Sequence, residues 1–139
     1  MWDEDALLLP GESKLGRYHV AILRRTSSGW VPTTPPVNML VTNFRLLMHP
    51  QTRRQYQPAV IPSHFITQVG KVELGYHKGV TIGLKNGMHL YLTINWSEND
   101  NEDLTDAIAK MLTSPLGNAF NLHPAEQDLT RMIAFISRL

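Results

Sequence analysis

Two arginine pairs are the residues of this chain whose type and spacing could do chemistry. Arg24 and Arg25 begin one long polar stretch, and Arg53 and Arg54 lie in another. The arginine side chain presents a planar fork of donors that fits phosphate or carboxylate oxygens in a bidentate manner. Such pairs on polar stretches predict an anion-binding surface, although charged loops that are simply solvated remain the alternative.

The residue types that a catalytic site needs are missing or scattered. The six histidines show no metal-ligand spacing, and the chain has no cysteine. The sequence contains no Gly-x-Ser-x-Gly motif, Gly-rich phosphate loop or Gly-x-Gly-x-x-Gly motif. Between Ser13 and Trp96 the sole acid is Glu73, so paired carboxylates are absent there. We therefore expect no enzymatic activity, no catalytic residue, no cofactor and no metal site.

Charge is distributed unevenly along the chain, although its net charge is only +1. The segment from Ser13 to Trp96 contains ten basic residues and one acid, which gives it a net charge of +9. The other acids lie before or after this segment. This asymmetry indicates an anionic partner, or else acids that fold back over the basic part and neutralise it.

Strand signals dominate the chain as far as residue 94. Thr42-Asn43-Phe44 predicts a tight hairpin turn, because Asn tolerates a left-handed backbone and the Thr hydroxyl can bond the turn's own amides. Asn86-Gly87 is the strongest short hairpin cue in the chain. Runs of β-forming residues predict seven strands, at residues 18–23, 37–41, 45–48, 58–61, 65–69, 80–84 and 90–94.

The apolar period changes from that of a strand to that of a helix after residue 96. Acids crowd the first turn, where the helix dipole favours them, and the apolar face comprises Leu104, Ile108, Met111 and Leu112. A second helix is predicted to start near Pro124. Its apolar stripe, which we expect either to pack on the chain's own barrel or to bind a partner, consists of Leu129, Met132, Ile133, Ile136 and Leu139.

Seven strands followed by a helix predict a small barrel or an orthogonal sandwich, with the helix plugging its open end. In an up-and-down meander alternate connections share an end, so the loops 24–36, 49–57 and 70–78 should form one rim. Trp30 could insert at a membrane interface from this rim, or simply pack over the barrel edge. The candidates for binding an anion or a lipid on the rim are Arg24, Arg25, Trp30, Arg53, Arg54, Lys71 and Lys78.

Four stretches of the chain resemble the GRAM domain, a family with a pleckstrin-homology-like fold. They are LLLPGE at 7–12, MLVTNFRLLM at 39–48, VIPSHFITQV at 60–69 and VTIGLKNGMHLYLTI at 80–94. The sequence departs from the family at Val37, where a Gly is usual, and residues 115–139 have no counterpart in it. The resemblance implies a mainly β (α+β) fold, with a seven-stranded barrel capped by a helix in residues 1–114. Residues 115–139 would form an additional C-terminal helical extension.

Arg45 directly follows the predicted turn, and the resemblance places an arginine there in the family too. In the structural interpretation, which we favour, its stem covers apolar surface and its fork ties down the turn or a neighbouring loop. In the other interpretation it binds phosphate.

These observations favour a non-catalytic binding module that docks an anionic partner, such as membrane phospholipid head groups, on the basic rim. The alternative is protein–protein interaction or self-assembly through the C-terminal helix, which leaves a homo-oligomer open. Nucleic acid is disfavoured, because aromatic residues among the basic strands are sparse. No apolar stretch reaches the ~20 residues that span a bilayer, and the acidic N-terminus is unlike a signal peptide. We expect a cytoplasmic protein that could attach peripherally to a membrane.

Overall fold

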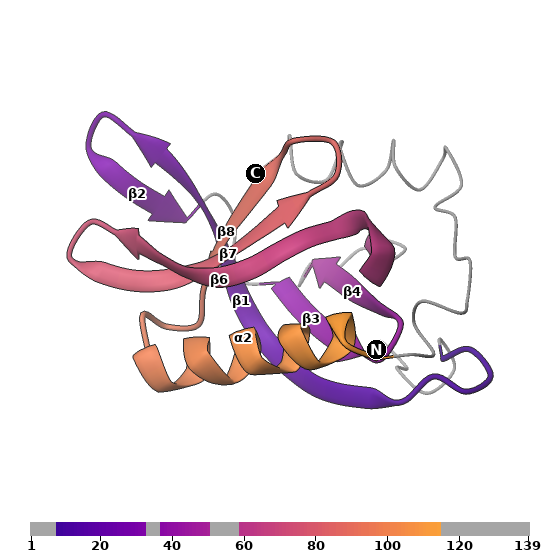
Figure 1. Ribbon diagram of the computed structural model, residues 1–139. Helices are drawn as coiled ribbons and strands as arrows, with labels where there is room; N and C mark the ends of the chain where they lie inside the picture. Colours follow the sequence, from indigo (N-terminus) through magenta and orange to yellow (C-terminus); the bar gives the residue numbers. More distant parts are fainter. Residues whose placement is uncertain (1–7, 33–36, 51–58, 115–139) are drawn as a thin grey trace.

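The structure is a computed structural model that describes residues 8–32, 37–50 and 59–114, and the mainly β fold is confirmed (Figure 1). The first five strands are β1 (Lys14–Thr26), β2 (Gly29–Pro32), β3 (Val37–Thr42), β4 (Arg45–Pro50) and β5 (Ala59–Pro62). They are followed by the short 3-10 helix η1 (Ser63–Phe65), β6 (Ile66–Leu74), β7 (His77–Leu84), β8 (His89–Thr93) and the helix α2 (Glu98–Leu112).

Strand β1 belongs to both halves of a single antiparallel sheet. Its first half pairs with β3, with Val20 opposite Val37, and its second half pairs with β8 and β2, with Leu23 opposite both Tyr91 and Pro32. The strands follow the order β5-β4-β3-β1-β8-β7-β6, and β2 pairs with β1 beside this path.

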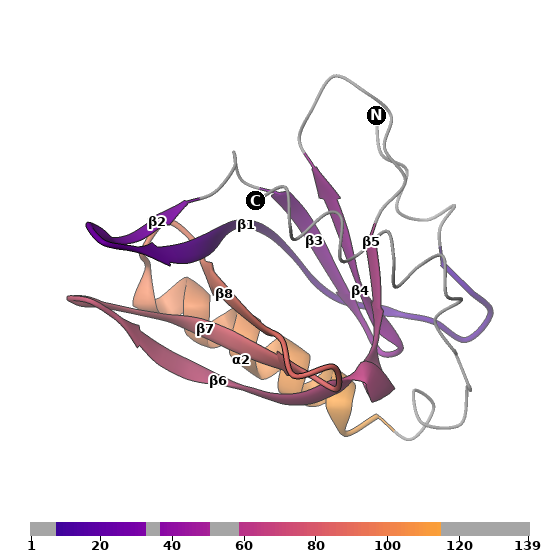
Figure 2. The same ribbon diagram turned by 90° about the horizontal axis from the view of Figure 1, so that it is seen from above.

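The predicted closed seven-stranded barrel is wrong, because the observed sheet has eight strands and stays open. Among residues 8–32, 37–50 and 59–114, the path of the sheet ends at β5 on one side and at β6 on the other, and no backbone hydrogen bonds pair these two strands. Figure 2 shows the two halves splayed apart, with α2 behind β6 and β7, and α2 also contacts β1 and β3. The helix therefore completes the enclosure of the core that closure of a barrel would otherwise provide.

The hydrophobic core lies between the two halves of the sheet and α2. Alternate residues of β3 and β4 face it, and so do alternate residues of β7 and β8, as expected when one face of a strand is buried. Leu104, Ile108 and Met111 of α2 are fully buried against this cluster. The helical face predicted from the apolar period is thus the face that packs.

The N-terminal part of α2 is held by polar contacts as well as by packing. Ser97 caps the helix, since its Oγ accepts the N–H of Asp100 at 3.4 Å. Asn101 is only 4% exposed, and its Oδ1 accepts the N–H of Ile94 at 2.8 Å. Its Nδ2 donates to the carbonyl oxygen of Lys78 at 3.1 Å. This side chain therefore ties the helix to β7 and to the end of β8.

Two of the predicted loops are largely hairpins instead. The stretch 24–36 contains the end of β1 and all of β2, and the stretch 70–78 contains the end of β6 and the start of β7. Thr26 closes the first turn, where its Oγ1 donates to the carbonyl oxygen of Gly29 at 2.8 Å. These strand segments project beyond the core, so no alternation of apolar residues marks them in the sequence.

The two ends of the molecule differ in the turns they carry. The β1–β2 turn (Thr26–Gly29) and the β6–β7 turn (Leu74–His77) both project to the left in Figures 1 and 2, and we call this the hairpin end. The β3–β4 and β7–β8 turns lie at the other end beside η1. There the backbone carbonyl of Phe44 accepts the N–H of Ser63, and the backbone carbonyl of Phe65 accepts the N–H of Lys85, each at 2.9 Å.

Replacement of Asn101 by leucine should destabilise the fold, because the N–H of Ile94 and the carbonyl of Lys78 would lose their partner in a buried site. We expect the free energy of unfolding to fall by roughly 1–3 kcal/mol, the usual cost of an unsatisfied buried polar group. Urea denaturation followed by tryptophan fluorescence would measure this change. Asn99→Leu, at an exposed position of the same helix, is the matched control, and equal effects of the two changes would contradict the assignment.

Candidate binding surface and the buried clamp

The arginine pair at residues 24 and 25 lies within β1 rather than on a loop. Both side chains are exposed, and Arg24 is opposite Val31 while Arg25 is opposite Trp30. Successive residues of an extended strand point to opposite faces of the sheet. The side chains of Arg24 and Arg25 therefore leave β1 on opposite faces of the sheet.

Trp30 is half-buried in β2 and packs across β1 against an aromatic ring of β8. Its ring lies 4.7 Å from the ring of Tyr91 on β8, measured between centroids, and Tyr91 in turn lies 6.4 Å from the ring of His89. This row of rings covers the outer face of β2, β1 and β8. The packing interpretation of Trp30, rather than insertion into a membrane, matches this geometry.

Lys71 on β6 forms an ion pair with Glu102 of α2. The hydrogen bond that Lys71 donates to Glu102, together with the negative charge of Glu102, raises the pKa of Lys71. The same contact lowers the pKa of Glu102, and the positive charge of Lys78 adds to this lowering. The acids of α2 therefore fold back over part of the basic segment. For these residues the alternative explanation of the uneven charge holds, and Lys71 already has an anionic partner within the chain.

Two aromatic side chains that the sequence analysis did not single out stand at the hairpin end. Tyr76 is fully exposed at the tip of the β6–β7 hairpin, where Gly75 takes a positive φ of 70° that glycine accommodates most readily. Trp96 is 37% exposed and follows β8, and its ring lies 5.1 Å from the ring of His77. The sequence signal that could have identified Tyr76 is its position directly after Gly75, a residue typical of turns.

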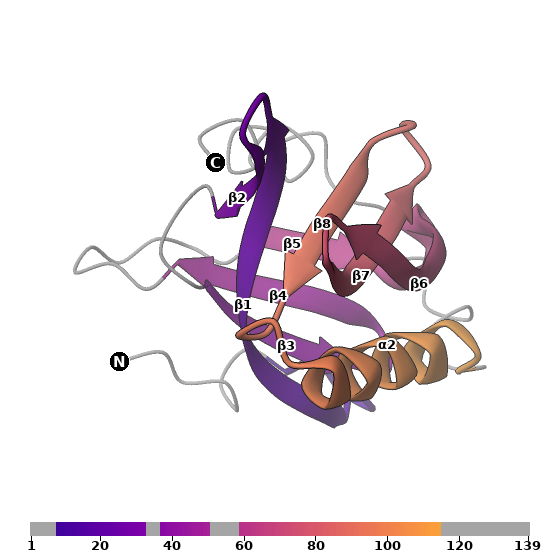
Figure 3. The same ribbon diagram turned by 90° about the vertical axis from the view of Figure 1, so that its left-hand side faces the viewer.

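Figure 3 views the hairpin end directly, with β8 between the two hairpins. The structure brings Arg24 and Arg25 to this end on one hairpin and Lys78 on the other, all with exposed side chains. Acidic residues accompany them, since Glu73 is opposite Lys78 and α2 begins with Glu98. The rest of the predicted site residues lie outside the described residues: Arg53, Arg54, Leu129, Met132, Ile133, Ile136 and Leu139.

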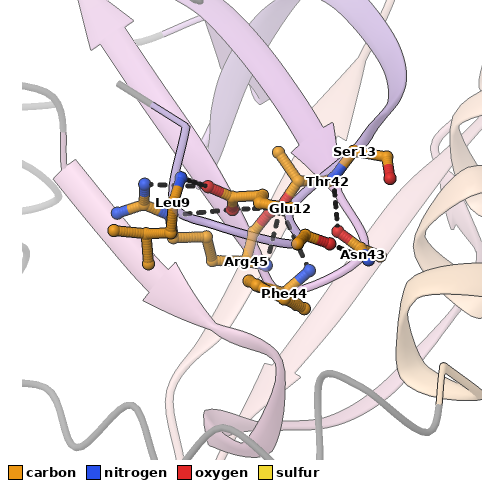
Figure 4. Close-up of polar contacts among 8 residues, drawn as sticks. Leu9, Glu12, Ser13, Thr42, Asn43, Phe44 and Arg45 are labelled. Carbon is orange, nitrogen blue, oxygen red and sulfur yellow. Dashed lines mark hydrogen bonds and ion pairs between the residues drawn. The ribbon is translucent and has the colours of Figure 1, made fainter. Parts of the chain in front are cut away.

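At the other end, the N-terminal segment is fastened to the β3–β4 turn by the buried carboxylate of Glu12 (Figure 4). Arg45 donates to it through Nε and Nη2, at 3.0 Å to Oε2 and 3.0 Å to Oε1 respectively. The hydroxyl of Thr42 donates to Oε2 at 2.6 Å, and the N–H of Leu9 donates to Oε1 at 2.9 Å. We call these four residues the clamp.

The β3–β4 turn is part of the same arrangement. The Oγ1 of Thr42 accepts the N–H groups of Phe44 at 3.1 Å and Arg45 at 3.0 Å, as the sequence indicated. Asn43 does not take the left-handed backbone. Its Oδ1 instead accepts the N–H of Ser13 at 2.7 Å, and its Nδ2 donates to the carbonyl of Gly11 at 3.2 Å.

The electrostatics of the clamp explain why Arg45 follows the turn. Burial by itself raises the pKa of Glu12, but the hydrogen bonds from Arg45, Thr42 and Leu9 outweigh it and lower the pKa below 4.5. Glu12 is therefore ionised at neutral pH, and its charge occupies two donors of the arginine fork. Arg45 thus has a structural role, and its partner Glu12, 33 residues away, was not foreseen.

Two general features concern the described part of the chain. None of its residues form a cluster of three or more histidine or carboxylate side chains that could hold a metal ion. A search of the same residues found no helix with the length and apolar character needed to cross a bilayer.

Glu12→Gln should lower the free energy of unfolding at pH 7 by about 3 kcal/mol, because it removes the carboxylate charge that faces the nearly buried Arg45. The lowered pKa of Glu12 contributes stability that is present above 4.5 and is lost as the pH falls through the folded-state value. The difference between the natural chain and the variant should therefore shrink in acid. Urea titrations at a series of pH values would measure it, with the exposed Glu73→Gln as control. A difference that stays constant into strong acid would contradict this assignment.

Comparisons with known proteins identify a shared fold but no family. No protein-family model matches the chain, and no curated protein matches its sequence. A solved structure, the C-terminal domain of an unknown protein from Leishmania infantum, is similar to it with a TM-score of 0.52 and 14% identity. The similarity covers 75% of this chain and 88% of that chain. At this identity, the comparison supports the mainly β architecture alone.

Proposed function

We propose that this protein is a non-catalytic binding module of the GRAM type, with a pleckstrin-homology-like fold, whose hairpin end docks on an anionic membrane. An open antiparallel sheet with a helix packed against strands of both halves supports the fold proposal. The four stretches that resemble the family also fall on distinct structural features. In chain order, they correspond to part of the clamp, to the β3–β4 hairpin, to the segment from β5 through η1 into β6, and to the β7–β8 hairpin.

The observation that carries the proposal is the exposure of aromatic rings beside basic side chains at the hairpin end. Tyr76 is fully exposed and Trp96 is 37% exposed, and they are the large exposed hydrophobic residues of the described chain. Exposed apolar groups of this kind mark interaction sites, and Tyr and Trp rings are favoured at the membrane–water interface. Arg24, Arg25 and Lys78 add attraction to a negatively charged surface.

The arrangement favours a surface contact over a pocket for one head group. Arg24 and Arg25 point to opposite faces of β1, and Lys78 is on a different hairpin, so these side chains do not converge on one phosphate. Glu73 and Glu98 also reduce the net charge of this end. Binding should therefore depend on the surface charge of the membrane rather than on the identity of the lipid, and the aromatic rings should supply a part that salt does not remove.

Co-sedimentation with vesicles tests this function. We expect the chain to bind vesicles that contain anionic phospholipid better than neutral vesicles, and to bind them less well as the salt concentration rises. Each basic residue near such a surface contributes about 1 kcal/mol, so Arg24→Ala, Arg25→Ala and Lys78→Ala together could reduce binding by up to about a hundredfold. Because Glu73 and Glu98 offset part of this attraction, we expect a loss of about tenfold or more. Tyr76→Ala should weaken binding at both low and high salt.

A matched triple variant separates the hairpin end from overall charge. Lys14→Ala, Lys85→Ala and Lys110→Ala remove the same charge at exposed positions away from the hairpin end, and binding should change little. Equal losses in the two triple variants would reduce the effect to net charge and refute a specific docking end. An absence of binding to any vesicle would refute membrane docking and direct attention to protein partners of Tyr76 and Trp96.

A further inference from the structure

The face of β3 and β4 that points away from the core carries a buried apolar pair. Met39 and Met48 are opposite each other and belong to the core cluster, so their neighbours Leu40 and Leu47 point to the other face. Leu40 and Leu47 are also opposite each other, and neither belongs to the core cluster. Their exposed fractions are nevertheless 0% and 1%. Other parts of the chain therefore cover this outer face.

The described residues explain what covers the outer face of β3 and β4 only near the β3–β4 turn. The segment that contains Glu12 lies over the outer face at Thr42, next to the turn. Helix α2 packs on the opposite side, because its apolar residues belong to the core cluster, and Figure 2 shows it on the side that faces β6 and β7. Helix α2 is thus not placed to cover Leu40 and Leu47.

We propose that residues 125–139 of the same chain form an amphipathic helix that packs on this outer face. Their apolar residues follow helical spacing and form a single stripe: Leu129, Met132, Ile133, Ile136 and Leu139. A helix of this length measures about 22 Å, at 1.5 Å per residue. The six residues of β3 extend for about 20 Å, so the helix matches the length of the face it would cover.

The path of the chain permits this placement. The C-terminal end of α2 lies near η1, which directly follows β5, the edge strand of this half of the sheet (Figure 2). Residues 115–124 can span about 33 Å when extended, which is enough to pass around that edge. The other segments outside the description offer less apolar surface, since residues 51–58 read QTRRQYQP and residues 1–7 read MWDEDAL.

Disulfide trapping in the full chain tests the proposal, and the absence of native cysteine makes the result unambiguous. Leu47→Cys would be combined in turn with cysteine at 129, 132, 133 or 136, on the apolar stripe. Control chains would combine Leu47→Cys with cysteine at 127, 131 or 138, on the opposite face of the same helix. After mild oxidation, we expect an intramolecular cross-link in at least one stripe pair and in none of the controls.

Each other outcome of the trapping experiment overturns the proposal. Cross-links between chains, detected as disulfide dimers and in mixtures of single-cysteine chains, would show that a second copy covers the face. Equal cross-linking of the stripe and the controls would show that the segment has no fixed contact. No cross-link in any pair would show that another segment covers Leu47.

Urea denaturation of full-length variants provides a second, independent readout. Leu47→Ala and Ile133→Ala should each lower the denaturation midpoint, and the shift in the double variant should be clearly smaller than the sum of the two. Arg131 lies on the opposite face of the predicted helix. The midpoint shift of Arg131→Ala should therefore simply add to the shift of Leu47→Ala in the double variant. Additive shifts for Leu47 and Ile133 would contradict their contact even if cysteine variants failed to fold.

Discussion

The buried ion pair between Glu12 and Arg45 fixes where the sheet begins. Breaking a buried ion pair by removing one partner is strongly destabilising, so the fold depends on this contact. Their contact places the start of β1 against the β3–β4 turn, and β1 then runs through both halves of the sheet. The position of every other strand follows, directly or through a neighbour, from that of β1.

This dependence gives the two ends of the molecule different chemistry. At the clamp the polar groups of Glu12, Thr42 and Arg45 satisfy one another, which makes the region suited to stability rather than to recognition. At the hairpin end the strands extend past the core, so aromatic and basic side chains there remain exposed. The long strand β1 connects the two regions, since it starts at the clamp and carries Arg24 and Arg25 near its far end.

Features of the fold that depend on local chemistry could be predicted from the sequence. The Thr42 turn, the Asn86-Gly87 hairpin and the buried face of α2 each follow from residues close together in the chain. Closure into a barrel could not be predicted, because it depends on whether two edge strands meet, and no local pattern encodes that. Strand β2 was missed because its Gly-Trp-Val-Pro sequence shows no alternation and resembles a loop.

The candidate site shows the same division between local and distant information. The sequence itself shows how many basic residues there are, but it does not show their partners, which can lie far away in the chain, as Glu102 does from Lys71. Whether a charge is available to a ligand depends on such partners. The opposite directions of Arg24 and Arg25 became evident only once both were known to lie in a strand.

The membership of β1 in both halves of the sheet also affects how the chain can fold during synthesis. The β1–β2 and β3–β4 hairpins require only nearby residues, but Ala21, Ile22 and Leu23 gain their partners on β8 some seventy residues later. Pairings of such long range form slowly, because the intervening chain must first be ordered. Until β8 emerges from the ribosome, one edge of β1 is an open template for pairing with another chain. The exposed arginines near this edge oppose such association through their like charge.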